Sequence, residues 1–175
     1  MSFPVYLIGA RGCGKTTVGK LLARQLSYQF CDTDQQLQQH LDQSIAEFVA
    51  QHGWETFRQQ EHQALLTVTS DNTVVATGGG IVLRDDNRQH MRQSGAVIWL
   101  SVDHQVLASR LTADPEMEQR PTLTGRPITE EIYEVLQQRL PLYQQAAHHC
   151  IDANQPPEKV VIDILTALSR DSLTA

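Results

Sequence analysis

The chain has 175 residues, of which 41% are hydrophobic and 19% charged, and its formal net charge is −6. At about 150 residues per domain, this length predicts one domain covering residues 1–175, with enough apolar material for a core. The composition excludes disordered and collagen-like chains, and the acidic balance argues against nucleic acid or an anionic membrane as a partner.

Targeting signals and disulfides are not expected either. No apolar stretch in the sequence approaches the about 20 residues that a membrane-spanning helix needs. Residues 1–4 lack the basic and apolar pattern of a secretory signal, so we expect a cytoplasmic protein. Cys13, Cys31 and Cys150 are odd in number and far apart, which favours reduced thiols over disulfides.

Short apolar or β-branched runs alternate with segments of helical periodicity along the whole chain. The runs are residues 5–8, 30–31, 73–76, 96–101 and 149–151. Nearly continuous apolar strands that alternate with helices are typical of a parallel sheet buried on both faces. We therefore predict a three-layer α/β domain.

The first predicted strand leads into a glycine-rich segment, residues 9–16, which reads Gly-Ala-Arg-Gly-Cys-Gly-Lys-Thr. This matches the phosphate-binding pattern GxxxxGK[ST], between a strand and a helix as the mechanism requires. Backbone N–H groups and the helix N-terminus would hold phosphate oxygens, Lys15 would reach the β and γ phosphates, and Thr16 would reach magnesium. The alternative is a glycine turn that only joins strand to helix. Cys13 is either an oxidisable thiol at a helix N-terminus or a small residue that the loop tolerates.

Two carboxylates, in the triplet Asp32-Thr33-Asp34, follow the second predicted strand. Because residues two apart on an extended chain project to the same side, we expect both to face the nucleotide pocket. A kinase needs one carboxylate near magnesium, which suits Asp32, and one that accepts or orients the attacking proton, which suits Asp34. The alternative is that they cap the next helix, and both roles can coexist. Asp103, after the fourth strand, is a competing magnesium carboxylate, although it is better placed as a helix cap.

A second helix is predicted to begin near Asp34. A capping box at residues 44–47 begins a third, which breaks at Gly53, and helical structure is expected again after the break. Many glutamines lie here among spaced apolar residues, which indicates solvated helical faces rather than low complexity. Arg58 lies on this region near Trp54 and Phe57. The third strand ends in Gly78-Gly79-Gly80, which would allow positive φ and a close backbone approach to a ligand, or form a plain tight turn.

The segment 113–127 shows neither helical nor strand periodicity, and it contains three prolines, a glycine and the arginines Arg120 and Arg126. We predict a lid over the site rather than a disordered loop. A helix over 129–145 follows and carries Arg139, and Pro156-Pro157 opens a last helix that ends near Leu168. Like Arg58, Arg139 lies near apolar residues, where a guanidinium fork can bind a carboxylate; surface ion pairing is the alternative.

A metal tract at residues 148–150 is not expected, although these residues are His-His-Cys. Adjacent strand residues alternate faces, and no further ligand has a suitable spacing.

Taken together, these motifs resemble the shikimate kinase family. The resemblance covers residues 5–168 and rests on the phosphate loop, the acidic triplet, Arg58 after Gly53-Trp54, the triple glycine, Arg120-Pro121-Thr122-Leu123, and Arg139 before Leu142-Tyr143. Details at residues 11–13 and 122–125 look like an enteric bacterial branch of the family. The resemblance implies a nucleoside-monophosphate-kinase-like fold with a five-stranded parallel sheet in the order 2-3-1-4-5. It also implies that ATP phosphorylates the 3-hydroxyl of shikimate, a step of aromatic amino-acid biosynthesis.

The resemblance also assigns roles to individual residues. It implies that Asp34 binds the shikimate hydroxyls, Arg58 and Arg139 its carboxylate, and Gly79 and Gly80 its ring, within or beside a helical region over residues 34–62. Thr16 and Asp32 would form the magnesium shell. The expected nucleotide-binding residues are Gly12, Cys13, Gly14, Lys15, Thr16, Thr17, Arg110 and Arg120, with the adenine held near residues 152–156. Lys15, Asp34 and Arg120 would be catalytic.

The expected cofactors are ATP and Mg²⁺, and the expected partner is shikimate bound by a monomer, with no nucleic acid or membrane. Two alternatives remain open from the residues: another small-molecule P-loop kinase, such as one acting on gluconate, and a nucleotide-dependent switch. Whether Asp34 removes the proton or only orients the hydroxyl also stays open, because a loose transition state needs little general base.

Overall fold

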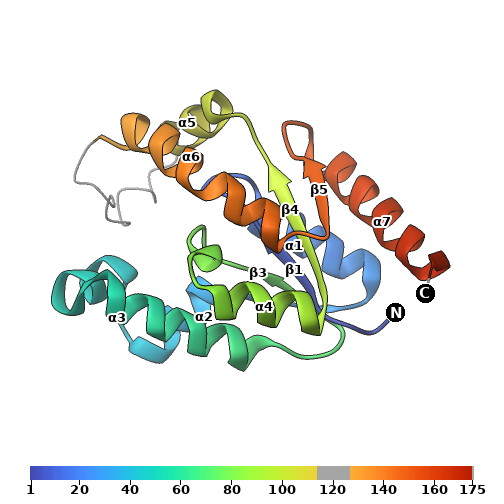
Figure 1. Cartoon of the computed structure of the whole chain (residues 1–175), viewed down its shortest axis with the longest axis horizontal. Helices are drawn as coiled ribbons and strands as arrows, with labels where there is room; N and C mark the ends of the chain where they lie inside the picture. Colours follow the sequence, from blue (N-terminus) through green and yellow to red (C-terminus); the bar gives the residue numbers. More distant parts are fainter. Residues whose placement is uncertain (114–126, 175) are drawn as a thin grey trace.

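A five-stranded parallel sheet lies at the centre of the computed structural model, which describes residues 1–113 and 127–174 (Figure 1). The strand order is β2-β3-β1-β4-β5, and every neighbouring pair is parallel. The strands are β1 (Val5–Ile8), β2 (Gln29–Asp32), β3 (Thr73–Ala76), β4 (Ala96–Ser101) and β5 (His149–Asp152). The predicted fold class and strand order are confirmed. The two edge strands are longer than predicted because their partly exposed ends lack an apolar signal.

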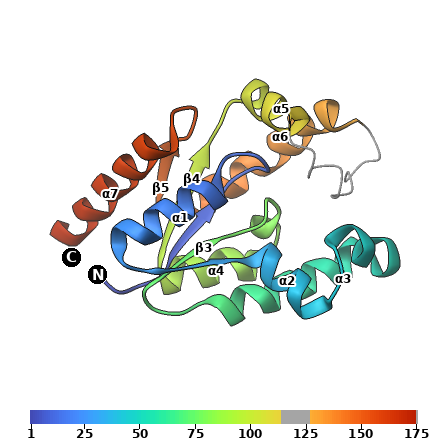
Figure 2. The same ribbon diagram turned by 180° about the vertical axis from the view of Figure 1, so that it is seen from behind.

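Helices cover both faces of the sheet, as the alternation of side chains along β1 shows. Val5 and Leu7 pack against α1 (Lys15–Leu26), α5 (His104–Ala113) and α7 (Pro157–Thr174). Tyr6 and Ile8 point to the opposite face, where α4 (Asp85–Ser94), α6 (Ile128–Ala146) and the end of α3 (Ile45–Val68) lie. In Figure 1 the helices α4 and α6 lie in front of the sheet, and in Figure 2, where the molecule is turned by 180°, α1 lies in front.

A separate small core forms where α2 (Thr33–Leu41) packs on α3, beside the sheet (Figure 1). The predicted capping box is confirmed, since the hydroxyl of Ser44 accepts a hydrogen bond from the N–H of Glu47 (3.1 Å). The predicted break is confirmed too, because Gly53 has φ +83° and ψ 169° and splits α3 into two parts. The second part carries Arg58 toward the triple glycine.

One helical prediction needs correction, and two short elements were not predicted. The last helix begins at Pro157 as expected but continues to Thr174 rather than ending near Leu168. Asp171 lies in this extension and pairs with Nε2 of His149 on β5 (2.6 Å), which fastens the end of the helix to the sheet. A 3-10 turn, η1 (Ile81–Leu83), and the polar helix α4 were not predicted individually.

Residues 114–126 of the predicted lid, 113–127, lie outside the described residues, and Arg120 lies among them. Within the described ranges, no helix combines the length and apolarity needed to cross a bilayer.

Candidate active site

The phosphate loop connects β1 to α1 at the carboxyl end of the central strand. Gly9, Gly12 and Gly14 all have positive φ, at +146°, +80° and +99°. A Cβ at Gly9 would lie 2.8 Å from the carbonyl oxygen of Leu100, so only glycine fits there. The loop therefore has the backbone that the sequence pattern predicts, and it ends at the N-terminus of a helix, which favours anions.

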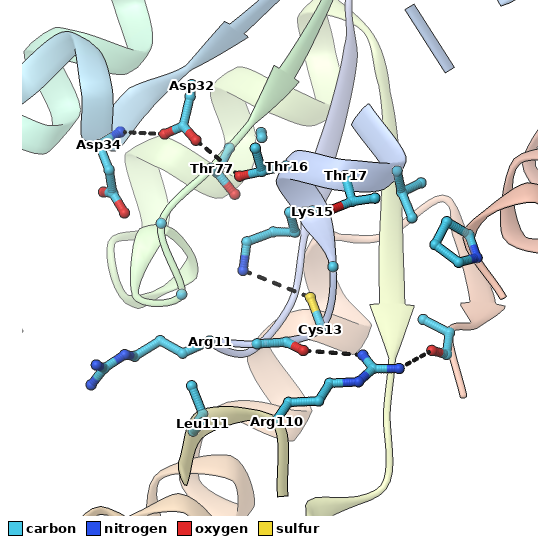
Figure 3. A pocket seen from close by; sticks show the side chains of 18 of the residues that line it. Arg11, Cys13, Lys15, Thr16, Thr17, Asp32, Asp34, Thr77, Arg110 and Leu111 are labelled. Carbon is cyan, nitrogen blue, oxygen red and sulfur yellow. Dashed lines mark hydrogen bonds between the residues drawn. The ribbon is translucent and has the colours of Figure 1, made fainter. Parts of the chain in front are cut away.

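A cavity of about 710 Å³ lies in front of this loop (Figure 3). Its volume falls within the range of sites that hold a cofactor. The phosphate loop and the start of α1 form one wall, and the ends of β2 and β3 form another. The lining includes these predicted residues: Gly12, Cys13, Gly14, Lys15, Thr16, Thr17, Asp32, Asp34, Gly79 and Arg110.

Lys15, at the start of α1, is one of the cations at this cavity. Nζ of Lys15 donates to the carbonyl oxygens of Gly9 (2.5 Å) and Ala10 (3.1 Å), which keeps the ammonium group beside the loop. Cys13 Sγ lies 3.8 Å from the same nitrogen and is buried, which favours its interpretation as a small residue within the loop.

Arg110 of α5 joins the loop to the predicted adenine region. Its guanidinium group donates to the carbonyl oxygens of Gly12 (3.0 Å) and Ala153 (3.2 Å) (Figure 3). Gln155 also lines the cavity, so the segment predicted to hold adenine does border the same space.

Asp32 caps the next helix, as one interpretation of the sequence predicts, and it also contacts Thr16. Its Oδ1 accepts the N–H groups of Asp34 (2.9 Å) and Gln35 (3.3 Å) and so caps α2, while its Oδ2 accepts the hydroxyl of Thr16 (3.2 Å) (Figure 3). A carboxylate and a hydroxyl oxygen thus lie together beside the phosphate loop. This donor set fits Mg²⁺, a hard cation that uses few protein ligands and keeps several waters.

The competing carboxylate lies elsewhere. Asp103 lines neither cavity of the site; its carbonyl oxygen accepts the N–H of Leu107, and its own N–H donates to Asn154. At residues 148–150, the two histidines have separate partners, since Nδ1 of His148 accepts the N–H of Val97 and His149 pairs with Asp171. Among the described residues there is no group of three side chains suited to a metal ion.

Asp34 does face the cavity, but not for the predicted reason. Helix α2 begins at Thr33, so Asp34 lies in its first turn and not on an extended chain. Asp34 is only 8% exposed there, and it borders a second cavity of about 40 Å³. Both cavities share Arg11, Asp34, Ile45, Gly78 and Gly79, so the two spaces adjoin.

The two predicted arginines, Arg58 and Arg139, both line the second cavity. Arg58 donates to the carboxylate of Glu61 (3.0 Å), and its guanidinium group lies 5.1 Å from the ring centre of Trp54 and 5.3 Å from that of Phe57. Arg139 approaches from α6 and is 7% exposed. Glu61 is only 1% exposed, so the ion pair of Arg58 is partly buried rather than a surface pair.

Burial shifts the pKa values of two charged groups at the second cavity. It raises the pKa of Glu61, an effect that Arg58 opposes and Asp34 reinforces. It also lowers the pKa of Arg139, while the phenol of Tyr143 acts in the opposite sense. Desolvated cations bind an anion more strongly than exposed ones do. The second cavity is therefore suited to a small carboxylate.

The triple glycine corrects one prediction. Gly78, Gly79 and Gly80 are absent from the glycines with positive φ, so a left-handed turn is not why they are glycine. A Cβ at Gly78 would come within 2.8 Å of the Glu61 carboxylate, and one at Gly80 would overlap the guanidinium group of Arg58. The missing Cβ atoms let these side chains approach the backbone.

All the predicted site residues that lie in the described ranges line one or both cavities. Sequence analysis missed Arg11 and Glu61. Arg11 lines both cavities and extends from the loop on the side where Asp34 lies (Figure 3). It occupies a free position of the loop pattern, so no signal marked it, whereas Glu61 stands three residues after Arg58 on one helical face.

Comparisons with known protein families and curated sequences both match this chain to shikimate kinases. The model of the shikimate kinase family matches residues 11–169. A curated protein of Yersinia enterocolitica named Shikimate kinase 2 is 56% identical over 173 residues, which is 99% of each chain. Its namesake in Erwinia tasmaniensis is 57% identical over 169 residues, or 97% of each chain.

Solved structures of shikimate kinases are similar to this chain as well. A shikimate kinase from Acinetobacter baumannii in complex with shikimate superposes with a TM-score of 0.91 at 30% identity, over 98% of this chain and 95% of the other. A gluconokinase from Sinorhizobium meliloti has a TM-score of 0.60 at 17% identity, covering 96% of this chain and 92% of its own, which shows a shared fold only.

Proposed function

This chain belongs to the shikimate kinase family, and from that premise we propose that it transfers the γ-phosphoryl group of ATP to the 3-hydroxyl of shikimate. The products are shikimate 3-phosphate and ADP. The observation that carries the proposal is the junction of the two cavities, where the buried carboxylate of Asp34 borders both the phosphate loop and the pocket of Arg58 and Arg139.

Phosphoryl transfer needs accurate positioning and charge neutralisation more than covalent chemistry. In our proposal the phosphate loop and Lys15 hold the β and γ phosphates, and Arg110 supports the nucleotide side. Thr16 and Asp32 would hold Mg²⁺, which when bound neutralises charge on the phosphates.

Arg58 and Arg139 would grip the acceptor carboxylate, and Asp34 would orient the hydroxyl that attacks the γ phosphorus. The small volume of the second cavity supports a compact acid as acceptor. In our proposal Arg120 completes the site from the lid, adding positive charge near the transferring group. One chain supplies both cavities, which supports action as a monomer.

Measurement of ADP release tests the reaction. The enzyme is given Mg²⁺ and ATP with shikimate, quinate, gluconate, nucleoside monophosphates or no acceptor, and Lys15→Met serves as the blank. We expect strong release with shikimate alone and its loss in the variant. Release with gluconate instead would overturn the roles of Arg58 and Arg139, and equal release without any acceptor would indicate a nucleotide-dependent switch.

A further inference from the structure

Four of the six backbone N–H and C=O groups of the triple glycine have identified partners among the described residues. The carbonyl oxygens of Gly78 and Gly80 accept the N–H groups of Ile81 and Leu83 (3.1 Å each). The carbonyl oxygen of Gly79 accepts the hydroxyl of Tyr143 (2.7 Å). The N–H of Gly78 donates to the hydroxyl oxygen of Thr33 (3.1 Å).

Two neighbouring donors are left over. Within residues 1–113 and 127–174, no hydrogen bond involves the N–H of Gly79 or of Gly80. Both glycines line the second cavity, between Arg58 and Arg139. Because buried N–H groups in proteins are nearly always paired, two adjacent unused donors at a cavity wall are suited to oxygen atoms of a ligand.

Peptide geometry links the hydroxyl of Tyr143 to one of these donors. The carbonyl of Gly79 and the N–H of Gly80 belong to the same planar trans peptide, so they point in opposite directions. Tyr143 holds the carbonyl, and it is not part of the lining of the second cavity, whereas both glycines are. Fixing the carbonyl toward Tyr143 therefore directs the N–H of Gly80 away from the Tyr143 hydroxyl, in a segment that lines the second cavity.

The two side chains that hold this segment are fully buried. Tyr143 has 0% exposure, and its ring stacks on Trp99 with 5.8 Å between ring centres and 22° between planes. Thr33 also has 0% exposure, at the start of α2. Three consecutive glycines have a wide choice of backbone angles, so such anchors are needed to keep one orientation.

We propose that Tyr143 and Thr33 are positioning residues for acceptor binding: they hold the glycine backbone from opposite helices so that the N–H groups of Gly79 and Gly80 face the acceptor. This inference rests on the proposed function and adds two residues that would act without touching shikimate. It predicts that loss of either hydroxyl weakens the binding of shikimate and leaves the binding of ATP unchanged.

The test compares Tyr143→Phe with Tyr6→Phe, a matched control. Tyr6 is also a tyrosine with 0% exposure, and its hydroxyl bonds to Thr69 and Ser94 away from both cavities. Both variants lose a buried hydroxyl and keep the ring. Steady-state kinetics give KM for each substrate and kcat, and calorimetric titration of shikimate without nucleotide gives its Kd.

For Tyr143→Phe we expect the KM and Kd for shikimate to rise about 3- to 10-fold, because the lost hydroxyl bonds to Gly79 and also interacts with Arg139, with the KM for ATP and kcat within about twofold. Thr33 bonds to Gly78, so the variants at that residue test the backbone effect separately. Tyr6→Phe should leave the shikimate constants unchanged. The proposal is overturned if the shikimate constants of Tyr143→Phe do not move, or if Tyr6→Phe raises them equally. A wild-type enzyme without shikimate-dependent ADP release would instead overturn the proposed function.

A second pair of variants keeps the test decisive if Tyr143→Phe does not fold. Thr33→Ser retains the oxygen that accepts the N–H of Gly78, while Thr33→Val has a similar shape without it. We expect the serine variant to keep the wild-type KM for shikimate and the valine variant to raise it about 3- to 10-fold. Equal constants for the two variants contradict the positioning role.

Discussion

Asp32 uses its two carboxylate oxygens for different purposes, one for the cap of α2 and one for Thr16. Asparagine caps a helix about as well as aspartate but lacks the charge. We expect Asp32→Asn to keep the stability of the wild type while requiring more Mg²⁺ for half-maximal rate. Asp32→Ala should lose about 1 kcal/mol as well, the usual value of a cap. Magnesium titrations and urea unfolding measure the two effects, and an unchanged magnesium requirement in both variants would remove Asp32 from the metal site.

Glu61 makes stability depend on pH, because burial raises its pKa in the folded protein. The folded state then binds more protons than the unfolded state above the ordinary carboxyl pKa, so this contribution to stability is lost as pH rises through the raised pKa. Glutamine at this position cannot ionise. We therefore expect the free energy of unfolding of Glu61→Gln, relative to the wild type, to increase as pH rises from 4 toward neutral. Parallel curves in urea titrations across that range would contradict the prediction.

At the scale of elements, the break at Gly53 directs the second part of α3 toward the site. Its φ of +83° with ψ of 169° lies in a region that only glycine adopts easily. A Cβ there would meet nothing within 4 Å, so alanine has no steric clash with other residues and only the backbone strain remains. We expect Gly53→Ala to lose about 1–3 kcal/mol of stability and to raise the KM for shikimate more than that for ATP.

Denaturant unfolding and steady-state kinetics check this prediction, with Ala50→Gly as a control on the same helix. Ala50 lies before the break and is exposed. Glycine there should cost only about 0.5–1 kcal/mol through helix propensity, with no change in KM. A wild-type stability for Gly53→Ala would show that the break is not required.

At the scale of the whole molecule, strand order brings the parts of the site together. β1 lies between β3 and β4, so the phosphate loop is next to the triple glycine after β3. Helix α6 places Arg139 at the same cavity as the triple glycine, although some 60 residues separate this arginine from the glycines in the sequence. The phosphate loop and the acceptor pocket therefore come from different parts of the chain.

We expect Arg120→Ala to lower kcat by about 10³-fold or more with little change in ATP affinity, because an arginine in the lid would stabilise charge only as the phosphoryl group transfers. Arg84→Ala is the control, since Arg84 forms an exposed ion pair with Asp86 far along the chain from the lid. Steady-state kinetics and nucleotide titration separate the two constants. An unchanged kcat in Arg120→Ala would exclude this arginine from the reaction.

Local features of the site could be predicted where a short stretch of sequence contains the whole requirement. The phosphate loop is one such case, since its glycines, Lys15 and Thr16 lie within eight consecutive residues. The capping box at Ser44 and the break at Gly53 are others. Helix α4 was not predicted, because only Asn87 and Met91 are buried on it and its sequence therefore has no apolar face with helical periodicity.

The sequence by itself determined the class of fold, the phosphate loop and the set of charged residues, because hydrophobic periodicity and short motifs act over a few neighbouring residues. Only the tertiary structure decided which distant groups meet. It placed Asp34 in a helical turn, set Glu61 against Arg58 beneath glycines that lack a Cβ, and brought Tyr143 to the carbonyl of Gly79, 64 residues away. These contacts depend on strand order and helix packing, and no spacing along the chain encodes them.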